Sequence, residues 1–457
     1  MDEQKISRRT LLAGALASTQ AAALDSKRTS DKPNVVVMLF DDLGTHDMGF
    51  LGARDLLTPN LDELAENGTI CRNWYSNAPV CAPARSALMT GRCPIRAGVP
   101  RNGLPLRSSE KTIASILKED EYATACIGKW HLGSTPDTVP NAHGFDYFYG
   151  FHEGCTDYFS HRFYWGEPKE VNFHDLWHNR EEIFEDGKYL TERIGDEACE
   201  FVQKRKGQPF FLYTAFNAVH YPMHAPEKYV QRFPTLARER QMYAAMLSAA
   251  DDTVGRIIST LEMTKQRENT IVFVIGDNGA TTERRAGLNQ QPATAGKNTP
   301  FRGFKFSTFD GGMHVPAVVN WPGRIARRKC DEIVMTADIL PTVCYLTGAK
   351  LPQDRTLDGR NIWPVLERGS TSPHDFVCWA EGPQLAIRRG PWKLVLNGVT
   401  RDGTPDGNQP LTGDDAIFLS NLEDDPGERT NLRHAHSEIV DQLQTLAYKW
   451  RREVEAN

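Results

Sequence analysis

The sequence lacks the paired cysteines of a structural zinc site. Its nine cysteines are scattered and no two form a Cys-x-x-Cys pair, so a site of paired thiolates is unsupported. Beyond the N-terminal segment there is no apolar run of the ~18 residues that a membrane-spanning helix needs. Charge of one sign is not in large excess, since the net charge is −6. This balance gives no reason to expect nucleic acid or an anionic membrane as partner, and an anionic substrate would need a local cluster of cations.

The first residues indicate an export signal. An arginine pair in residues 7–12 (SRRTLL) precedes an apolar run to Ala17 and the small residues 21–23, a pattern typical of a twin-arginine signal. The alternative is a frayed basic N-terminus. We therefore predict a twin-arginine signal segment at residues 1–23 and an exported protein, periplasmic or extracellular, with no membrane span in the mature chain.

Five segments have the pattern of strands buried on both faces of a parallel sheet. Each is a short apolar run, and helical patterns lie between them, the longest from about Leu236 to Leu261. The five are Asn34 to Leu39, Tyr122 to Ile127, Phe210 to Phe216, Thr270 to Ile275 and Val315 to Asn320. Strands that alternate with helices predict an α/β fold with a large doubly wound, mostly parallel sheet flanked by helices.

Polar or charged residues follow four of these five strands. The endings are Asp41-Asp42, Lys129-Trp130-His131, His220 and Asp277-Asn278, and only the strand to Asn320 lacks one. Open α/β sheets bind ligands outside the carboxyl ends of their strands. We therefore expect these side chains to meet at one edge of the sheet.

The pattern changes after about Pro364. Short antiparallel strands are expected at Phe376 to Ala380, Leu385 to Arg388 and Lys393 to Leu396, followed by an amphipathic helix from Ser437 to Glu453. A chain of 457 residues is long enough for a large domain and a smaller one. We predict a catalytic domain at residues 32–363 and a C-terminal α+β subdomain, an antiparallel sheet plus a helix, at residues 364–457.

The sharpest local signal is Cys81-Ala82-Pro83-Ala84-Arg85. A helix is expected to start here and to end near Gly91, which places Cys81 at a helix N-terminus. The partial positive charge at such an end would favour a thiolate. The alternative is an unreactive buried cysteine beside a helix-starting proline.

Taken in order along the chain, these motifs resemble the type I, formylglycine-dependent sulfatases of the alkaline phosphatase superfamily. The resemblance covers nearly the whole chain after the signal segment. It is carried by Cys81-x-Pro83-x-Arg85 with its extension to Arg92, by Asp41-Asp42, by residues 128–133 (GKWHLG), by residues 277–279 (DNG) and by the stretch 305–316.

The resemblance implies that a formylglycine-generating enzyme oxidises Cys81 to formylglycine. The aldehyde hydrates to a geminal diol, and one diol oxygen attacks sulfur to give a covalent sulfo-enzyme. The second hydroxyl then loses its proton and sulfate is expelled. A serine or an unmodified thiol lacks that second hydroxyl, so the resemblance explains why a cysteine would be oxidised here.

The resemblance also implies a Ca²⁺ ion. Its ligands would be Asp41, Asp42, Asp277 and Asn278, with the modified Cys81 completing the set. Carboxylate and amide oxygens suit a hard cation. The alternatives are a cap or turn at Asp41-Asp42 and a tight turn at Asp-Asn-Gly.

Five further residues match catalytic positions of the family. The resemblance implies that Arg85 holds the diol, that Lys129 and Lys305 bind sulfate oxygens, and that His131 takes the second diol proton. It implies that His220 acts near the leaving oxygen as general acid with Lys305. His224 is the alternative to His220, which directly follows its strand. Solvated lysines and structural histidines are the ordinary fate of these residue types.

The chain departs from the family pattern in a few places. Asp310-Gly311-Gly312-Met313-His314 stands where the family usually has Glu-Gly-Gly, an apolar residue and Arg, and residues 45–47 (THD) are also unusual. Between Phe151 and Trp177 a long loop carries aromatic and polar residues, among them Arg162 and Trp165. It could bind sugar rings, or it could be an ordinary surface excursion.

Two other functions remain open at this stage. A formylglycine-dependent phosphodiesterase or phosphonate monoester hydrolase would typically have Asp-His at the second metal pair, where this chain has Asp277-Asn278. A non-catalytic protein that binds sulfated glycans would keep Cys81 as a thiol. We expect sulfated carbohydrates as substrates, with aryl sulfates as the alternative.

Overall fold

The computed structural model describes residues 32–163 and 172–456. The predicted signal segment at residues 1–23 lies outside these residues, and so does Trp165. All nine cysteines lie in the described part of the chain, where they are buried and form no disulfide bond. Among the described helices, none is long and apolar enough to cross a membrane.

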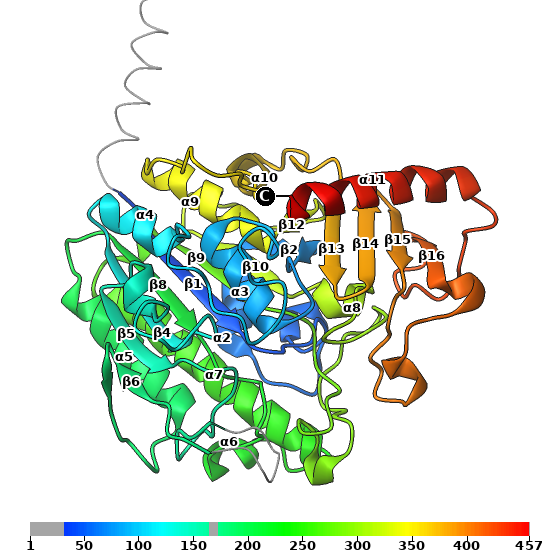
Figure 1. The fold of residues 1–457 in the computed structure, drawn as a ribbon. Helices are drawn as coiled ribbons and strands as arrows, with labels where there is room; N and C mark the ends of the chain where they lie inside the picture. Colours follow the sequence, from blue (N-terminus) through cyan, green and yellow to red (C-terminus); the bar gives the residue numbers. More distant parts are fainter. Residues whose placement is uncertain (1–31, 164–171, 457) are drawn as a thin grey trace, which may run out of the picture.

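Among the described residues, ten strands form one large sheet (Figure 1). Their order is β11-β2-β10-β9-β1-β8-β4-β5-β6-β7, and the five from β9 to β5 are parallel. The strands are β1 (Asn34–Phe40), β2 (Thr69–Cys71), β4 (Ala123–Lys129), β5 (Tyr147–Phe151), β6 (Trp177–His178), β7 (Glu181–Glu182), β8 (Phe210–Ala215), β9 (Thr270–Gly276), β10 (Ala317–Asn320) and β11 (Arg328–Cys330). A two-stranded sheet, β3 (Trp74–Tyr75) with β12 (Val334–Met335), lies apart from it.

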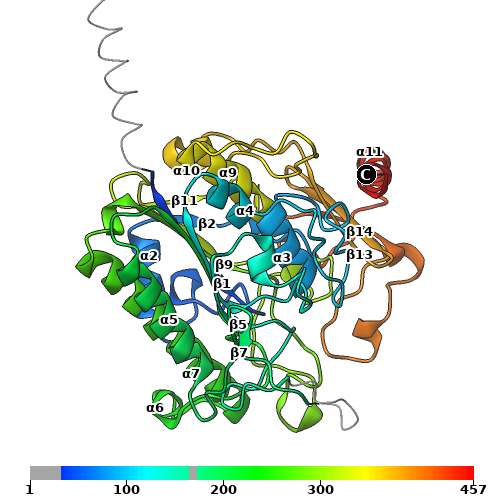
Figure 2. The ribbon, with the colours of Figure 1, turned by 60° about the vertical axis from the view of Figure 1, so that its left-hand side comes forward.

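Helices cover both faces of the sheet (Figure 2). Alternate residues of β1 explain this: Val36 and Met38 pack into one core cluster, and Val35 and Val37 into the other. The first core contains α2 (Pro59–Glu66), α5 (Leu190–Lys204), α6 (Glu227–Val230) and α7 (Arg238–Met263); the second contains α3 (Cys81–Thr90), α4 (Ile113–Glu119), α9 (Ile339–Thr347) and α10 (Trp363–Arg368). The predicted doubly wound, mostly parallel fold is confirmed.

A separate antiparallel sheet follows in the C-terminal part. Its strands, in order, are β13 (Val377–Glu381), β14 (Gln384–Arg389), β15 (Trp392–Leu396) and β16 (Ile417–Asn421). One face packs on α11 (Ser437–Glu455), and the other on Tyr75 and on residues around α8 (Asp310–Met313). This is the predicted α+β subdomain, whereas the boundary at residue 364 stays a prediction.

The fifth predicted strand differs from the other four in direction. β10 pairs antiparallel with both β9 and β2. Its carboxyl end therefore lies at the opposite edge of the sheet from those of β1, β4, β8 and β9. This explains why the sequence after Asn320 lacks the polar residues that follow the other strands.

Candidate active site

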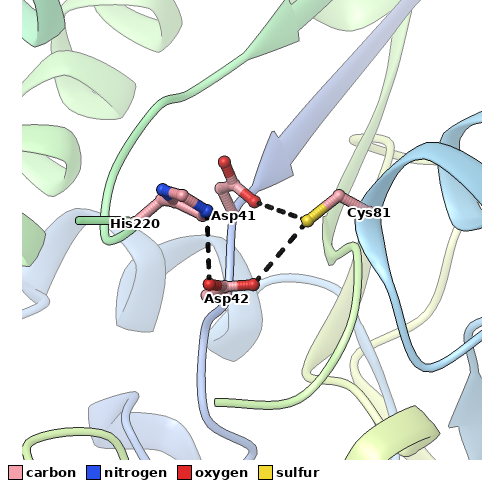
Figure 3. A group of neighbouring side chains, drawn as sticks. All are labelled: Asp41, Asp42, Cys81 and His220. Atoms are coloured by element: carbon pink, nitrogen blue, oxygen red, sulfur yellow. Dashed lines mark hydrogen bonds and ion pairs between the residues drawn. The ribbon is translucent and has the colours of Figure 1, made fainter. Parts of the chain in front are cut away.

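Side chains from the ends of parallel strands and from the start of one helix meet in a buried cluster. Asp41 and Asp42 follow β1, His220 comes soon after β8, and Cys81 is the first residue of α3. One ligand atom from each of these four residues lies within 4.8 Å of the others (Figure 3). Lys129 at the end of β4 and Asn278 after β9 hydrogen-bond to the two aspartates of this cluster.

Cys81 is enclosed by protein. Its side chain is 1% exposed, and its Sγ lies 3.6 Å from Asp41 Oδ1 and 3.9 Å from Asp42 Oδ1. Burial raises the pKa of the thiol well above its ordinary value, against the opposing effect of Lys129 and Lys305. Burial therefore outweighs the helix N-terminus, and the expected activation of Cys81 as a thiolate is not favoured here. In this environment the unmodified side chain stays a neutral thiol and is a poor nucleophile.

Arg85 is fully buried one helical turn after Cys81. Its Nε and Nη2 donate to Asp277 Oδ2 at 3.1 and 2.8 Å, and its Nη1 donates to the carbonyl oxygen of Lys129 at 3.0 Å. Burial raises the pKa of Asp277 to about 7, with Asp41 adding to the effect and Arg85 opposing it. Arg85 thus ties α3 to the ends of β4 and β9.

Two buried lysines bind the two aspartates. Lys129 Nζ donates to Asp41 Oδ2 at 2.5 Å, and Lys305 Nζ donates to Asp42 Oδ2 at 2.9 Å. Burial by itself would raise the pKa of Asp41, but Lys129 and the neighbouring cations hold it well below its ordinary value. Burial would lower the pKa of Lys305, but Asp42 and the other acidic groups around it raise that pKa well above its ordinary value. Asp41 is therefore ionised and Lys305 is protonated, and the two lysines give the site donors for an anionic group.

The two histidines of the site are neutral. Burial, together with Lys129 and Arg85, lowers the pKa of His131 well below its ordinary value, and burial lowers the pKa of His220 to about 4. Nδ1 of His220 must donate to the carbonyl oxygen of Tyr221, 2.8 Å away, because that oxygen can only accept. Nε2 is then the acceptor and faces Lys305 Nζ at 3.4 Å. The lysine rather than the histidine carries the proton of this pair.

His224, the alternative to His220, lies elsewhere. Its Nδ1 is 3.1 Å from Asp157 Oδ2, and its side chain is 40% exposed. Nδ1 of His131 is buried and has no hydrogen-bond partner among the described residues. His131 is therefore free to accept a proton at that atom.

The donor set fits a hard divalent cation. Asn278 Nδ2 donates to Asp42 Oδ1 at 2.8 Å, while its Oδ1 is buried without a hydrogen-bond partner among the described residues. A buried acceptor left over beside carboxylates is what an oxygen-coordinated ion would satisfy. Asp277 is engaged by the protein itself, since its Oδ1 accepts from the backbone N–H of Asp42 and its Oδ2 from Arg85.

Sequence reasoning missed Glu283 and Arg285. Glu283 Oε2 lies 3.3 Å from Lys305 Nζ, and its Oε1 accepts from Arg285 Nη2 at 2.6 Å. Burial opposes ionisation of Glu283, but Lys305 and Arg285 prevail and lower its pKa to about 2. The only available signal was its place shortly after Asp277-Asn278-Gly279 in a polar run (TTERR).

The departures from the family pattern at Asp310 and His314 lie at the junction with the C-terminal sheet. Asp310 accepts from Lys393 Nζ at 2.6 Å and from the Tyr75 hydroxyl at 2.7 Å. His314 packs against Phe301 and the edge of Tyr75. These residues connect the two sheets, and they do not contact Cys81.

The described part of the loop from Phe151 to Trp177 uses its aromatic residues internally. His152 stacks on Phe148, and His174 lies 3.1 Å from Glu182 Oε1. Arg162 is exposed, and its backbone pairs with that of His174 in an isolated antiparallel β-bridge. Any sugar-binding role of Arg162 stays a prediction.

Two cavities lie near the site. One of about 300 Å³ is lined by residues 281–284, by Lys305 and by the segment 401–408. A larger one of about 1050 Å³ lies at the junction of the two sheets, around Asp310 and His314, and does not reach Cys81. Of these two cavities, the smaller one borders the cluster, because Lys305 is part of its lining.

Fold and site together define a hydrolase with a doubly wound α/β fold, whose buried centre combines carboxylates for a cation with lysines for an anionic group. The sulfatase family model matches residues 33–349. N-acetylgalactosamine-6-sulfatase of Canis lupus familiaris is 32% identical over 93% of this chain and 86% of its own length, and an arylsulfatase of Hemicentrotus pulcherrimus is 34% identical over 79% and 67%. The crystal structure of Ps i-CgsB in complex with k-i-k-neocarrahexaose superimposes with a TM-score of 0.80 at 31% identity, covering 92% of this chain and 93% of that one.

The chain belongs to the sulfatase family, within the alkaline phosphatase superfamily. It is a sulfuric ester hydrolase.

Proposed function

We propose that this protein is a calcium-dependent carbohydrate sulfatase whose nucleophile is formylglycine made from Cys81. One observation carries the proposal: Cys81 Sγ lies 3.6 and 3.9 Å from Asp41 and Asp42, the same carboxylates that bind Lys129 and Lys305. The position of the nucleophile, the oxygen ligands and the cations for a sulfate group thus share one buried site. This combination is what attack on a sulfate monoanion requires.

The carbohydrate part of the proposal rests on relatives. One similar protein is named for a sulfated N-acetylgalactosamine, and one similar structure was solved in complex with a neocarrahexaose. Both resemble this chain over most of its length at above 30% identity. We extend the substrate class, sulfated sugars, to this chain.

Asp41, Asp42, Asp277 and Asn278, with residue 81, would hold the Ca²⁺ ion. When bound, the ion would neutralise charge on a sulfate oxygen and lower the pKa of the nucleophile. The orphaned Oδ1 of Asn278 supports this assignment. So does the all-oxygen character of the four side chains, because Ca²⁺ prefers oxygen ligands.

The chain's own residues orient the reactants. The hydrated aldehyde at position 81 would supply one oxygen for attack on sulfur and a second hydroxyl whose deprotonation expels sulfate. Arg85, held by Asp277 and by the carbonyl oxygen of Lys129, fixes the start of α3 and so the direction of residue 81. Lys129 and Lys305 would bind sulfate oxygens in exchange for part of their contact with the aspartates.

Protons move through two side chains. His131 is neutral and has a free buried Nδ1, which suits the acceptance of a proton from residue 81. Lys305 is charged and faces the acceptor Nε2 of neutral His220. We propose that this pair delivers the proton to the leaving oxygen, with Lys305 as its source.

Mass spectrometry of the peptide containing Cys81 tests the nucleophile. Formylglycine is about 18 Da lighter than cysteine, and we expect that mass after co-production with a formylglycine-generating enzyme. Cys81→Ala should abolish turnover of 4-nitrophenyl sulfate without loss of the fold. A cysteine mass in an active preparation would contradict the mechanism. A cysteine mass in an inactive protein that binds sulfated glycans would favour the binding-protein alternative.

A second assay separates the enzyme alternatives. The rates with 4-nitrophenyl sulfate and with an aryl phosphonate are compared on the same preparation. We expect the sulfate to be preferred, because Asn278 stands where the phosphonate hydrolases typically have histidine. Preference for the phosphonate would overturn the assignment.

We also propose that the protein is exported through the signal at residues 1–23. Cell fractionation of the wild type and of a variant with Arg8→Lys and Arg9→Lys tests this. The wild type should be found outside the cytoplasm and the variant inside it.

A further inference from the structure

A cavity of about 300 Å³ lies on the Lys305 side of the site. Lys305 forms part of its lining and also contacts Asp42 and His220. This volume is at the lower end of the range for small-molecule sites, enough for about one sugar ring. A ring in this cavity would lie on the leaving-group side of the ester.

Two segments that are distant in sequence form the walls. Thr282, after β9, donates from Oγ1 to the carbonyl oxygen of Arg401 at 2.6 Å, and the backbone N–H of Arg401 donates to Gly407 at 2.7 Å. Gly403 has φ +86°, and a Cβ there would lie 3.0 Å from Pro292. These contacts fix the backbone that presents Arg401 to the cavity.

The cavity has an excess of positive charge. Its lining contains three cations, Lys305, Arg284 and Arg401, and one carboxylate, Glu283. Glu283 is already bound to Lys305 and to Arg285 outside the lining. The surplus charge is therefore that of the two arginines at the mouth.

Neither Arg284 nor Arg401 forms an ion pair with a carboxylate among the described residues. Arg284 is exposed and has no ion pair among them. Arg401 Nε is buried without a hydrogen-bond partner, and Nη1 makes one long bond of 3.3 Å to Asn408. Glu381 is close enough for Arg401 to affect it, but burial dominates and raises its pKa to about 7. Arg401 thus lines the cavity with a guanidinium group whose donors are not all used by the described residues.

We propose that this cavity is a subsite for a second anionic group of the substrate, bound by Arg284 and Arg401. The group is a sulfate or a carboxylate on the sugar ring that carries the scissile ester or on its neighbour. Arginine binds such oxyanions through paired, charge-assisted hydrogen bonds. Because the whole chain is negative, at −6, attraction of a polyanionic sugar depends on such a local cluster. The inference rests on the proposed function and adds that preferred substrates carry at least two negative charges.

The test measures kcat/KM for three sugars: a monosulfated disaccharide, its disulfated counterpart, and a monosulfated disaccharide that contains a uronate. The variants are Arg401→Gln and Arg284→Gln, with Arg401→Lys as the conservative replacement. The matched control is Arg327→Gln, an exposed arginine outside the cavity lining. Melting temperatures verify that each variant is folded.

The wild type should prefer a dianionic sugar, and the disulfated and uronate arms distinguish which oxyanion is bound. For the preferred sugar, each Gln variant should lose about tenfold in kcat/KM, chiefly through a higher KM. This loss should be about five times as large as the loss of kcat/KM for the monosulfated sugar. Arg401→Lys should recover part of the loss, and the control should stay within about twofold of the wild type. Equal losses for all three sugars, or none, would overturn the subsite. An active sulfatase with no such preference refutes the subsite alone, whereas no turnover even of 4-nitrophenyl sulfate refutes the proposed function as well.

Discussion

The contact between Arg85 and Asp277 gives a stability prediction with a magnitude. Both side chains are at most 1% exposed, and Arg85→Met would leave the carboxylate without its cation. Removing one partner of a buried ion pair costs about 3–5 kcal/mol of unfolding free energy. Arg72 and Asp331 lie closer, at 2.6 Å, but are 51% and 62% exposed. Arg72→Met should therefore cost about 0–1 kcal/mol.

The loss in the Arg85→Met variant should depend on pH. Burial raises the pKa of Asp277 to about 7 although Arg85 opposes it, so removing Arg85 raises that pKa further. A group whose pKa is higher in the folded state destabilises the fold as pH rises toward the folded pKa. In the wild type the decrease in stability with rising pH ends near pH 7, whereas in the variant stability continues to decrease above pH 7. The difference between the two proteins should be larger at pH 8 than at pH 6.

Urea unfolding followed by tryptophan fluorescence measures these differences, with EDTA present so that protein groups alone are compared. The double variant Arg85→Met/Asp277→Asn should recover part of the stability, because no uncompensated charge remains buried. An Arg85→Met variant that loses no more stability than Arg72→Met would refute the reasoning. So would a double variant less stable than the single one.

Three further predictions follow from the site and its surroundings. Lys305→Met should lower kcat by about 10²–10⁴-fold for sulfates with alcohol leaving groups, and His220→Gln by less, because the lysine carries the proton; the reverse ranking would contradict this. Chelation by EDTA should abolish turnover and lower the melting temperature, and addition of Ca²⁺ should restore both. Each tenfold increase of the free Ca²⁺ concentration above its Kd should add about 1.4 kcal/mol to the free energy of unfolding. Burial raises the pKa of Glu428 to about 7, so ionisation of Glu428 removes up to about 3 kcal/mol of stability as pH rises from about 4.5 to 7. The free energy of unfolding of Glu428→Gln relative to that of the wild type should therefore increase between pH 5 and pH 8. Parallel curves of stability against pH would contradict this prediction.

The parallel core could be predicted because its signal is local. The run Val35 to Leu39 is apolar at every position, which is typical of a strand with helices on both faces. Polar residues placed shortly after such strands then predicted which side chains meet. The direction of β10 could not be predicted, since the residues of a strand do not determine whether its neighbour runs parallel or antiparallel.

Other features depend on the relative size of opposing electrostatic effects and on contacts between residues that are distant in the sequence, neither of which can be read from the sequence. The helix terminus at Cys81 favours a thiolate by about 0.3–1 kcal/mol, whereas burial shifts a pKa by several units and wins. Arg401 borders the reactive site only because it contacts Thr282, 119 positions earlier. Glu283 likewise gains its importance from Lys305, which the intervening turns bring beside it.

The burial of Cys81 constrains when the proposed oxidation can occur relative to folding. Every residue of α3 is buried, so another enzyme cannot take hold of this segment once the domain has closed. The proposed oxidation must then happen on a chain that is still open, before the core assembles around it. If the protein is exported in its folded state, the oxidation of Cys81 must take place in the compartment where the chain is synthesised. Treatment of purified, folded protein with the maturing enzyme should accordingly fail where joint expression succeeds.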